Sequence, residues 1–314
     1  MEYRMLGTSG IEVSVIGMGC WPMAGVGWTG IDDDQSLAAL KTAIDQGITL
    51  IDTAYMYGQN GESERLVAKA IAECREQIVL ATKCGLHWEG DLMIRDSSRS
   101  QILKEFEESL RRLNTDYVDL YQVHAFDEKT PIQETAETLA ELLSEGKIRA
   151  IGVSNYDSDQ MKEFARYAPL HSNQPPYNIL MREIELDLLP HCQAENVGVV
   201  TYWPLYRGLL TGKYGRGHKF PDGDSRIDNP HFNGSSLDAT LEMLEQIRPI
   251  AEACNKSVAQ TVINWTANQP GITAALCGAT RPEHVAQNVE AVGWHLSEAQ
   301  MQSIAGAAKA RTEK

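Results

Sequence analysis

Four polar residues follow predicted strands, and together they could move a proton to or from a carbonyl or alcohol oxygen. Asp52 ends one short apolar strand, Tyr57 follows in the same loop, Lys83 ends the next strand and His124 ends a third. A tyrosine hydroxyl has an ordinary pKa of about 10, so it exchanges protons near neutral pH only beside a positive charge. Lys83 could supply that charge, Asp52 could hold the ammonium, and His124 could donate a hydrogen bond to a substrate oxygen. The set has no nucleophile with a partnered base and no electron source, so a redox reaction would need a hydride cofactor.

Each of these residues alone also has a structural interpretation. A histidine after a strand is more often structural than catalytic, and an aspartate with a lysine is more often an ordinary ion pair. A tyrosine in a loop often packs its ring and leaves its hydroxyl in water. Four such residues at successive strand ends would require several coincidences, so we interpret the set as a catalytic site.

Alternating strand and helix patterns predict the fold that positions this set. Short β-rich runs alternate with segments of helical periodicity, which is typical of a parallel sheet. In a (β/α)8 TIM barrel the carboxyl ends of all strands meet at one rim, where active sites lie. The length of 314 residues favours this α/β barrel as one domain over 1–314, with an N-terminal β-hairpin (3–6 and 11–15) and long loops at the carboxyl rim. The eight strands are expected near 15–18, 49–51, 78–82, 118–123, 150–153, 170–173, 199–202 and 273–277.

The glycine pattern argues against an open dinucleotide-binding sheet. That fold needs G-x-G-x-x-G directly after the first strand. Gly17 and Gly19 have no third glycine in place, and the chain continues through Trp21 and Pro22. An open sheet is therefore disfavoured.

Several helix ends carry recognisable signals. Gly47 and Gly146 stand where a helix should end in a left-handed residue before the next strand. Capping boxes are predicted for Ser98 with Gln101, Ser257 with Gln260, and Ser297 with Gln300.

Composition excludes several classes of partner. The 28 Lys and Arg against 43 Asp and Glu give a net charge of −15, which disfavours nucleic acid and anionic membranes as partners. The six cysteines are far apart, so we expect reduced thiols and no metal site. There is no signal-like amino terminus and no run of 18 apolar residues, so a cytoplasmic protein is expected.

One segment, 206–235, breaks the alternation of strands and helices. It holds six glycines, two prolines and eight charged residues without apolar periodicity. A loop of this length is usually functional or disordered, so it is either a tolerated surface insertion or a lid over a ligand.

The chain resembles the aldo-keto reductase family, in particular a bacterial-type branch with a GLLTGKY segment. The resemblance implies a (β/α)8 barrel that binds NADP(H) without a Rossmann fold and reversibly reduces aldehydes or ketones. It runs through Asp52-Thr53-Ala54-Tyr55-Met56-Tyr57-Gly58, Lys83, His124, Ser154-Asn155, 173–178, 208–214, 278–283 and Gln287-Asn288.

The resemblance also implies roles for individual residues. Tyr57 would be the general acid and base, Lys83 would lower its pKa, Asp52 would pair with Lys83, and His124 would orient the carbonyl. The nicotinamide amide would bind Ser154, Asn155 and Gln174, and its ring would stack on Tyr202. Trp203 would also contact the cofactor, and Leu205, Gly208 and Leu210 would line the pyrophosphate path. Lys213, Arg281 or His284 would hold the 2′-phosphate in place of a lysine at Gly278. Thr280, Gln287 and Asn288 would lie near the adenosine.

The substrate is expected to be a small carbonyl compound or alcohol in a pocket with aromatic walls. The residues expected to form these walls are Trp21, Trp28, Trp88 and Phe126. NADP(H) is favoured, NAD(H) stays possible, and the oligomeric state is open. The main alternative is a cofactor-binding regulatory subunit of the same fold. A metal-dependent barrel hydrolase is disfavoured, because of the residues at the strand ends only His124 would suit a metal.

Overall fold

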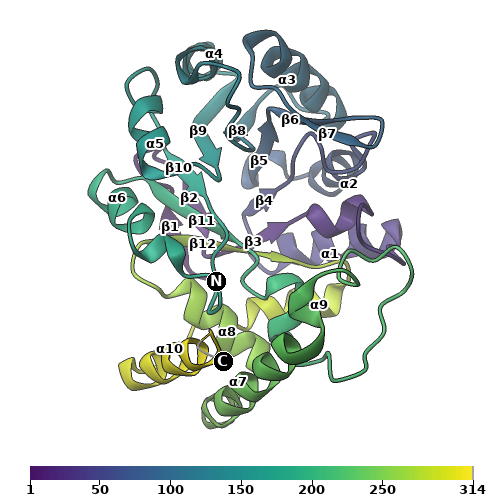
Figure 1. The fold of residues 1–314 in the computed structure, drawn as a ribbon. Coiled ribbons are helices and arrows are strands. Elements are labelled where there is room, and N and C mark those ends of the chain that lie inside the picture. Colours follow the sequence, from purple (N-terminus) through teal and green to yellow (C-terminus); the bar gives the residue numbers. More distant parts are fainter. Residues whose placement is uncertain (313–314) are drawn as a thin grey trace.

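A closed barrel of eight parallel strands forms the centre of the computed structural model, which describes residues 1–312 (Figure 1). The pairing is parallel throughout, and β12 pairs with β3 to close the ring. The predicted (β/α)8 barrel is confirmed, with small shifts such as the start of β10 at Ser172 rather than Leu170. The strands are β3 (Ile16–Gly19), β4 (Leu50–Asp52), β5 (Val79–Cys84), β8 (Val118–Val123), β9 (Ile148–Ser154), β10 (Ser172–Gln174), β11 (Gly198–Tyr202) and β12 (Ile272–Gly278).

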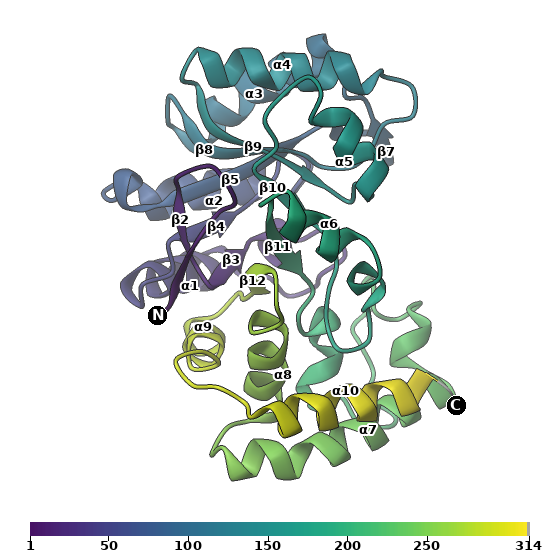
Figure 2. The same cartoon turned by 90° about the vertical axis from the view of Figure 1, so that its left-hand side faces the viewer.

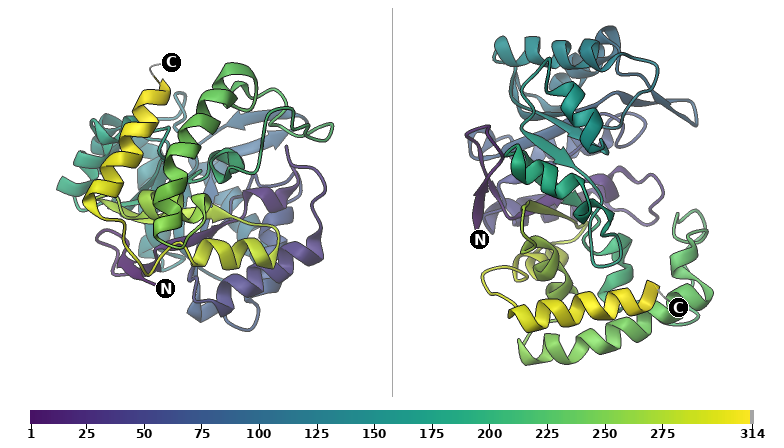
Figure 3. Two further views of the ribbon diagram at one scale, coloured as in Figure 1. Left: turned by 90° about the horizontal axis from the view of Figure 1, so that it is seen from below. Right: turned by 60° about the vertical axis from the view of Figure 1, so that its left-hand side comes forward.

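Helices follow the strands and cover the outside of the barrel. Two of them, α7 and α8, lie between β11 and β12, and α10 lies alongside α7 at one end of the molecule (Figures 2 and 3). The helices are α1 (Asp33–Asp45), α2 (Glu62–Ile71), α3 (Arg99–Leu113), α4 (Ile132–Ser144), α5 (Ser158–Phe164), α6 (Leu188–Ala194), α7 (Gly234–Ala253), α8 (Val258–Ala267), α9 (Pro282–Val289) and α10 (Glu298–Thr312). No helix within residues 1–312 is long and apolar enough to span a membrane.

The predicted amino-terminal hairpin, β1 (Tyr3–Met5) with β2 (Glu12–Ser14), closes one end of the barrel. Leu6 and Val13 are fully buried in one cluster with Leu50 of the barrel strands. The Ser14 hydroxyl accepts the backbone N–H groups of Thr49 and Leu50 at the start of β4. Because the hairpin occupies the amino ends of the strands, the carboxyl ends are left to carry the site.

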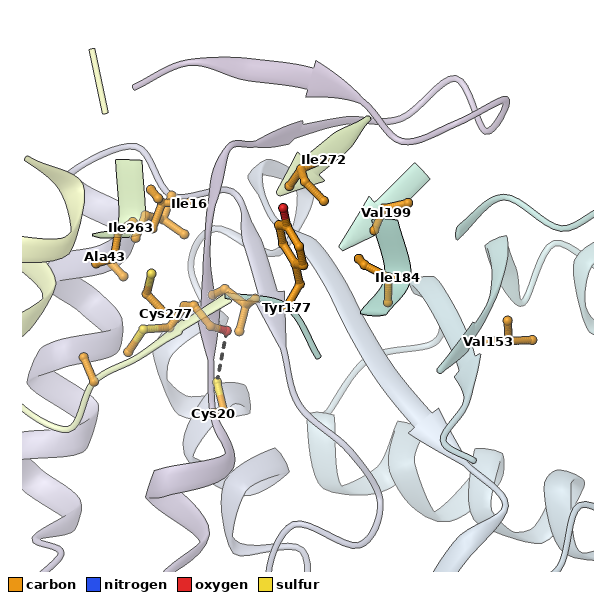
Figure 4. Close-up of a cluster of buried hydrophobic side chains, with 14 of the residues drawn as sticks. Ile16, Cys20, Ala43, Val153, Tyr177, Ile184, Val199, Ile263, Ile272 and Cys277 are labelled. Carbon is orange, nitrogen blue, oxygen red and sulfur yellow. Dashed lines mark hydrogen bonds between the residues drawn. The ribbon is translucent and has the colours of Figure 1, made fainter. Parts of the chain in front are cut away.

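Outward-facing strand residues pack against the surrounding helices. Ile16 of β3 and Cys277 of β12 share a cluster with Ile263 of α8 (Figure 4). In the same region the Cys20 thiol donates to the carbonyl of Met18 at 3.7 Å. All six cysteines are free, as expected for reduced thiols.

Most helix-end predictions are confirmed. Capping boxes form at Ser257 and Ser297, and φ is +85° at Gly47 and +73° at Gly146. The capping box predicted at Ser98 is wrong, because the Ser98 side chain makes no capping hydrogen bond to α3. Gln101 instead donates to Glu105 at 2.8 Å, one turn further along the same helix.

A second hairpin, β6 (Leu86–Glu89) with β7 (Leu92–Arg95), lies between β5 and α3. This hairpin is not among the elements predicted from the sequence. Its turn contains Gly90 at φ +61°, and it places Trp88 in a strand rather than in an irregular loop.

Candidate active site

Lys83 is the centre of the polar cluster at the carboxyl ends of the strands. Its side chain comes from β5 and is fully buried. The ammonium donates to Asp52 Oδ1 at 2.5 Å, to the carbonyl of Thr53 at 2.9 Å and to the Tyr57 hydroxyl at 3.1 Å. A lysine ammonium has three donors, so all are used. Burial is the largest single influence on the pKa of Lys83 and would lower it, but the Asp52 charge, the interaction with Tyr57 and the hydrogen bonds to both residues together raise that pKa, so the ammonium keeps its proton.

Asp52, the last residue of β4, is held by more than the lysine. Its Oδ2 accepts from the side-chain amide of Gln174 at 2.8 Å and from that of Gln122 at 3.1 Å. Gln174 therefore points its amide nitrogen at Asp52, whereas the resemblance assigns Gln174 to the nicotinamide. Gln122 is a member of the site that the sequence pattern does not identify. Its signal is a polar residue inside the buried strand β8, two positions before His124.

Tyr57 lies in the loop after β4, and that loop folds back on itself. The N–H of Tyr57 donates to the carbonyl of Ala54 at 3.0 Å, which turns the chain so that the hydroxyl meets Lys83. Burial raises the pKa of Tyr57 above its ordinary value, and the charge and hydrogen bond of Lys83 oppose this rise without cancelling it. Lys83 thus lowers this pKa in the expected direction, but burial has the larger effect.

His124 follows β8 and lies beside Tyr57, with ring centroids 5.6 Å apart. Its Nδ1 is buried and has no hydrogen-bond partner among the described residues. Burial and, secondarily, the charge of Lys83 hold the pKa of His124 well below its usual value. The imidazole is therefore neutral near pH 7, and a neutral ring still carries one N–H donor.

Three of the residues expected to contact nicotinamide form a chain beside His124. The Asn155 amide donates to the Ser154 hydroxyl at 3.0 Å and to the carbonyl of His124 at 3.1 Å. The Tyr202 hydroxyl donates to Asn155 Oδ1 at 2.8 Å. Asn155 adopts φ +59°, a left-handed conformation that asparagine tolerates better than most residues. The ends of β9 and β11 are thus joined next to the cluster around Lys83.

Trp203 and the three residues expected along the pyrophosphate path differ in how deeply they are buried. Trp203 and Leu205 are half-buried, and Gly208 has φ +90°. Leu210 is fully buried in the main core and donates its N–H to the carbonyl of Leu205 at 3.2 Å. The structure therefore does not bring the Leu210 side chain or its N–H to a ligand surface.

The residues expected at the adenosine end lie on the loop after β12 and on α9. Arg281 precedes α9, is exposed, and pairs with Glu283 at 3.9 Å. Burial lowers the pKa of His284, and the nearby charge of Lys213 lowers it further. A basic group of Lys213, Arg281 and His284 is thus gathered here. The other expected residues are Gly278 and Gln287, which are exposed, Thr280, which is half-buried, and Asn288, which is buried.

Two of the predicted pocket aromatics flank Tyr57. The Trp21 ring meets the Tyr57 ring edge-on at 4.9 Å. Trp88 contacts the same cluster and donates from its indole nitrogen to the carbonyl of Met56 at 2.9 Å. Phe126 instead is half-buried and packs edge-on against Tyr156 of the main core at 5.7 Å.

The segment 206–235 reaches the loop after β3 (Figure 1). Trp28 belongs to that loop. Ser225 donates to the carbonyl of Gly27 from its N–H at 3.1 Å and from its hydroxyl at 2.8 Å. The Arg226 guanidinium lies 4.6 Å from the centre of the Trp28 ring. We call residues 206–235 the strap. Two donors beside these contacts, Trp28 Nε1 and Arg207 Nε, are buried without a partner among the described residues.

Comparison with known proteins finds a family and several relatives that this chain resembles over most of its length. The profile described as "Aldo/keto reductase family" matches residues 15–309. The chain is 43% identical to the Aldo-keto reductase YhdN of Bacillus subtilis, over 97% of this chain and 92% of that one. It is 37% identical to the NADH-specific methylglyoxal reductase of Escherichia coli, over 95% and 96%. The solved structure of the glycerol dehydrogenase AKR11B4 from Gluconobacter oxydans superposes with a TM-score of 0.91 at 38% identity, covering 99% of this chain and 96% of that one.

Proposed function

The chain belongs to the aldo/keto reductase family, and on that premise we propose that it reduces aldehydes or ketones to alcohols with NADP(H), using Tyr57 as the proton donor. The observation that carries the proposal is the arrangement around Lys83, whose buried ammonium joins Asp52 to the Tyr57 hydroxyl. Within residues 1–312 no partnered nucleophile accompanies this set, so proton transfer at an oxygen is the chemistry that it supports best.

The residues present suit a nicotinamide dinucleotide phosphate. The unpartnered buried donors Trp28 Nε1 and Arg207 Nε match the acceptor oxygens of a pyrophosphate under the strap. The basic group of Lys213, Arg281 and His284 beside α9 matches a 2′-phosphate. When bound, the reduced nicotinamide supplies a hydride to the carbonyl carbon.

The protein's own residues then handle the carbonyl oxygen. The neutral His124 imidazole donates a hydrogen bond that orients and polarises it. Tyr57 donates its proton to the same oxygen, and the Lys83 ammonium stabilises the phenolate left on Tyr57. Asp52, held by Gln122 and Gln174, keeps the lysine charged and in place.

A spectrophotometric screen with NADPH and NADH side by side tests this function. Two of the similar proteins are named for three-carbon compounds, methylglyoxal and glycerol, so small oxo- and hydroxy-carbonyls are the first substrates to include. We expect carbonyl-dependent oxidation of NADPH, with slower oxidation of NADH. Cofactor binding without oxidation by any carbonyl would instead favour the regulatory-subunit alternative.

We expect the reduction rate to be nearly independent of pH from about 6 to 9. The pKa of Tyr57 is raised, so the proton is present below that pKa and is lost only as pH rises through it. The pKa of His124 is lowered, so no imidazole titration falls within this range. Oxidation of the alcohol needs the phenolate and should rise with pH. A profile of kcat in both directions measures this, and a reduction rate that halves between pH 6 and 8 would contradict it.

Replacing Arg281 with alanine should raise KM for NADPH about tenfold, because one charged hydrogen bond to the 2′-phosphate is lost. KM for NADH should stay unchanged. Arg248→Ala is a matched control, since Arg248 is also exposed and pairs with Glu245 three residues earlier on α7. Equal KM values for NADPH in Arg281→Ala and the parent protein would show that Arg281 is not a phosphate ligand.

A further inference from the structure

Arg112, on the outer helix α3, contacts the loop that carries Tyr57. It donates to the carbonyl of Tyr55 at 3.1 Å, and its guanidinium lies 4.3 Å from the centre of the Tyr55 ring. Gly61, at φ +75°, permits this approach, because a Cβ there would lie 2.4 Å from Arg112 Cδ. The arginine is thus fitted against a segment that ends, two residues later, at the proposed proton donor.

The other backbone group of Tyr55, its N–H, is held by the strand that carries the lysine. The N–H of Tyr55 donates to the carbonyl of Lys83 at 3.1 Å. Tyr55 is therefore held between the backbone of β5 and the guanidinium of Arg112. A shift of this residue would alter the 3.1 Å separation between the Tyr57 hydroxyl and Lys83 Nζ.

Arg112 is itself anchored by two carboxylates. Glu64 of α2 is fully buried and lies 3.3 Å from the guanidinium, and Glu108 of α3 lies 3.4 Å from it. The other oxygen of Glu64 accepts from the hydroxyl of Thr82, the residue before Lys83, at 2.8 Å. Glu108 accepts from the Tyr55 hydroxyl at 2.6 Å. The loop before Tyr57 and the strand that carries Lys83 are thus both hydrogen-bonded to carboxylates that pair with the Arg112 guanidinium.

We propose that Arg112 is a positioning residue for the reaction: it sets the distance between Tyr57 and Lys83 by holding the Tyr55 carbonyl from outside the barrel. The proposal rests on the proposed role of Tyr57. An ion pair with Glu64 alone would serve stability, whereas the contact with the Tyr55 carbonyl acts on the catalytic loop. Arg112 reaches the Tyr55 carbonyl and Glu64 through Nη1 and Glu108 through Nη2. A lysine ammonium is a single donor atom and could not span all three acceptors.

The test compares Arg112→Met with the double variant Arg112→Met/Glu64→Gln. The single change leaves the buried Glu64 carboxylate unpaired, so it should lower stability as well as activity. The double change removes that charge and should recover much of the stability. We expect kcat to remain about tenfold below the parent value in the double variant, with the Kd for NADPH within about twofold. Arg112→Lys should be intermediate in kcat.

A second readout does not depend on turnover. With tyrosines labelled with ¹³C at Cζ, the Tyr57 resonance is assigned by its loss in Tyr57→Phe, and its titration should move to higher pH in the double variant because the ammonium lies further away. Arg111→Met is the control, since the exposed Arg111 donates only to Glu107 of its own helix. Recovery of kcat together with stability, or an unchanged Tyr57 titration, would overturn the proposal. Full activity in Tyr57→Phe would instead refute the proton-donor role, while the titration would still report on Arg112.

Discussion

Replacing Tyr57 with phenylalanine is expected to lower kcat for carbonyl reduction about 10²–10⁴-fold, the usual contribution of a positioned general acid. Only the hydroxyl is removed. The ring keeps its edge-on contacts with Trp21 at 4.9 Å and with His124 at 5.6 Å, so the loop should retain its shape. Affinity for NADPH should stay within about twofold, because no expected cofactor contact is lost.

Steady-state turnover and a fluorescence titration with NADPH measure these two quantities. Tyr3→Phe is a suitable control, since Tyr3 is partly exposed in the amino-terminal hairpin and its hydroxyl donates only to the carbonyl of Gly47. If Tyr57→Phe kept kcat within about threefold of the parent protein, another group would have to deliver the proton.

Replacing Lys83 with methionine is expected to lower the free energy of unfolding by about 3–5 kcal/mol, as well as to abolish turnover. Methionine fills much of the same volume, but Asp52 then remains as a buried carboxylate without its cation. The amides of Gln122 and Gln174 still donate to it, but neither carries a charge. The cost therefore comes from the unpaired charge rather than from a cavity.

The double variant Lys83→Met/Asp52→Asn separates stability from catalysis. Removing the carboxylate together with the ammonium should recover most of the unfolding free energy, measured by denaturant titration at pH 7, while turnover stays absent. A double variant no more stable than Lys83→Met would mean that the lysine stabilises the fold through contacts other than its ion pair. A double variant with parental turnover would exclude both residues from the reaction.

The fold and the four central residues could be predicted because their signals are local. Most strands are short apolar runs, several helices end at a glycine or begin at a capping box, and Asp52, Lys83 and His124 each stand within one residue of the end of a strand. Polar side chains at the carboxyl ends of a parallel barrel must meet at one rim. Strand–helix alternation therefore predicts their convergence without any knowledge of distances.

The other contacts of the site could not be predicted, because they join distant parts of the chain. The hydrogen bond from Gln174 to Asp52 spans 122 positions, and that from Ser225 to Gly27 spans 198. No periodicity in the sequence predicts either of these hydrogen bonds. The direction of the Tyr57 pKa shift also needed the structure, because it depends on how fully the hydroxyl is removed from water and not only on the neighbouring charge.

The hairpin that closes the amino end of the barrel bears on how this protein could be attached to a solid support. Met5 is 52% exposed on that hairpin, on the side opposite the carboxyl ends of the strands. A coupling handle at this position would turn the closed end toward the support. The reactive rim would then face the bulk solution, so immobilised protein should keep access to its reactants.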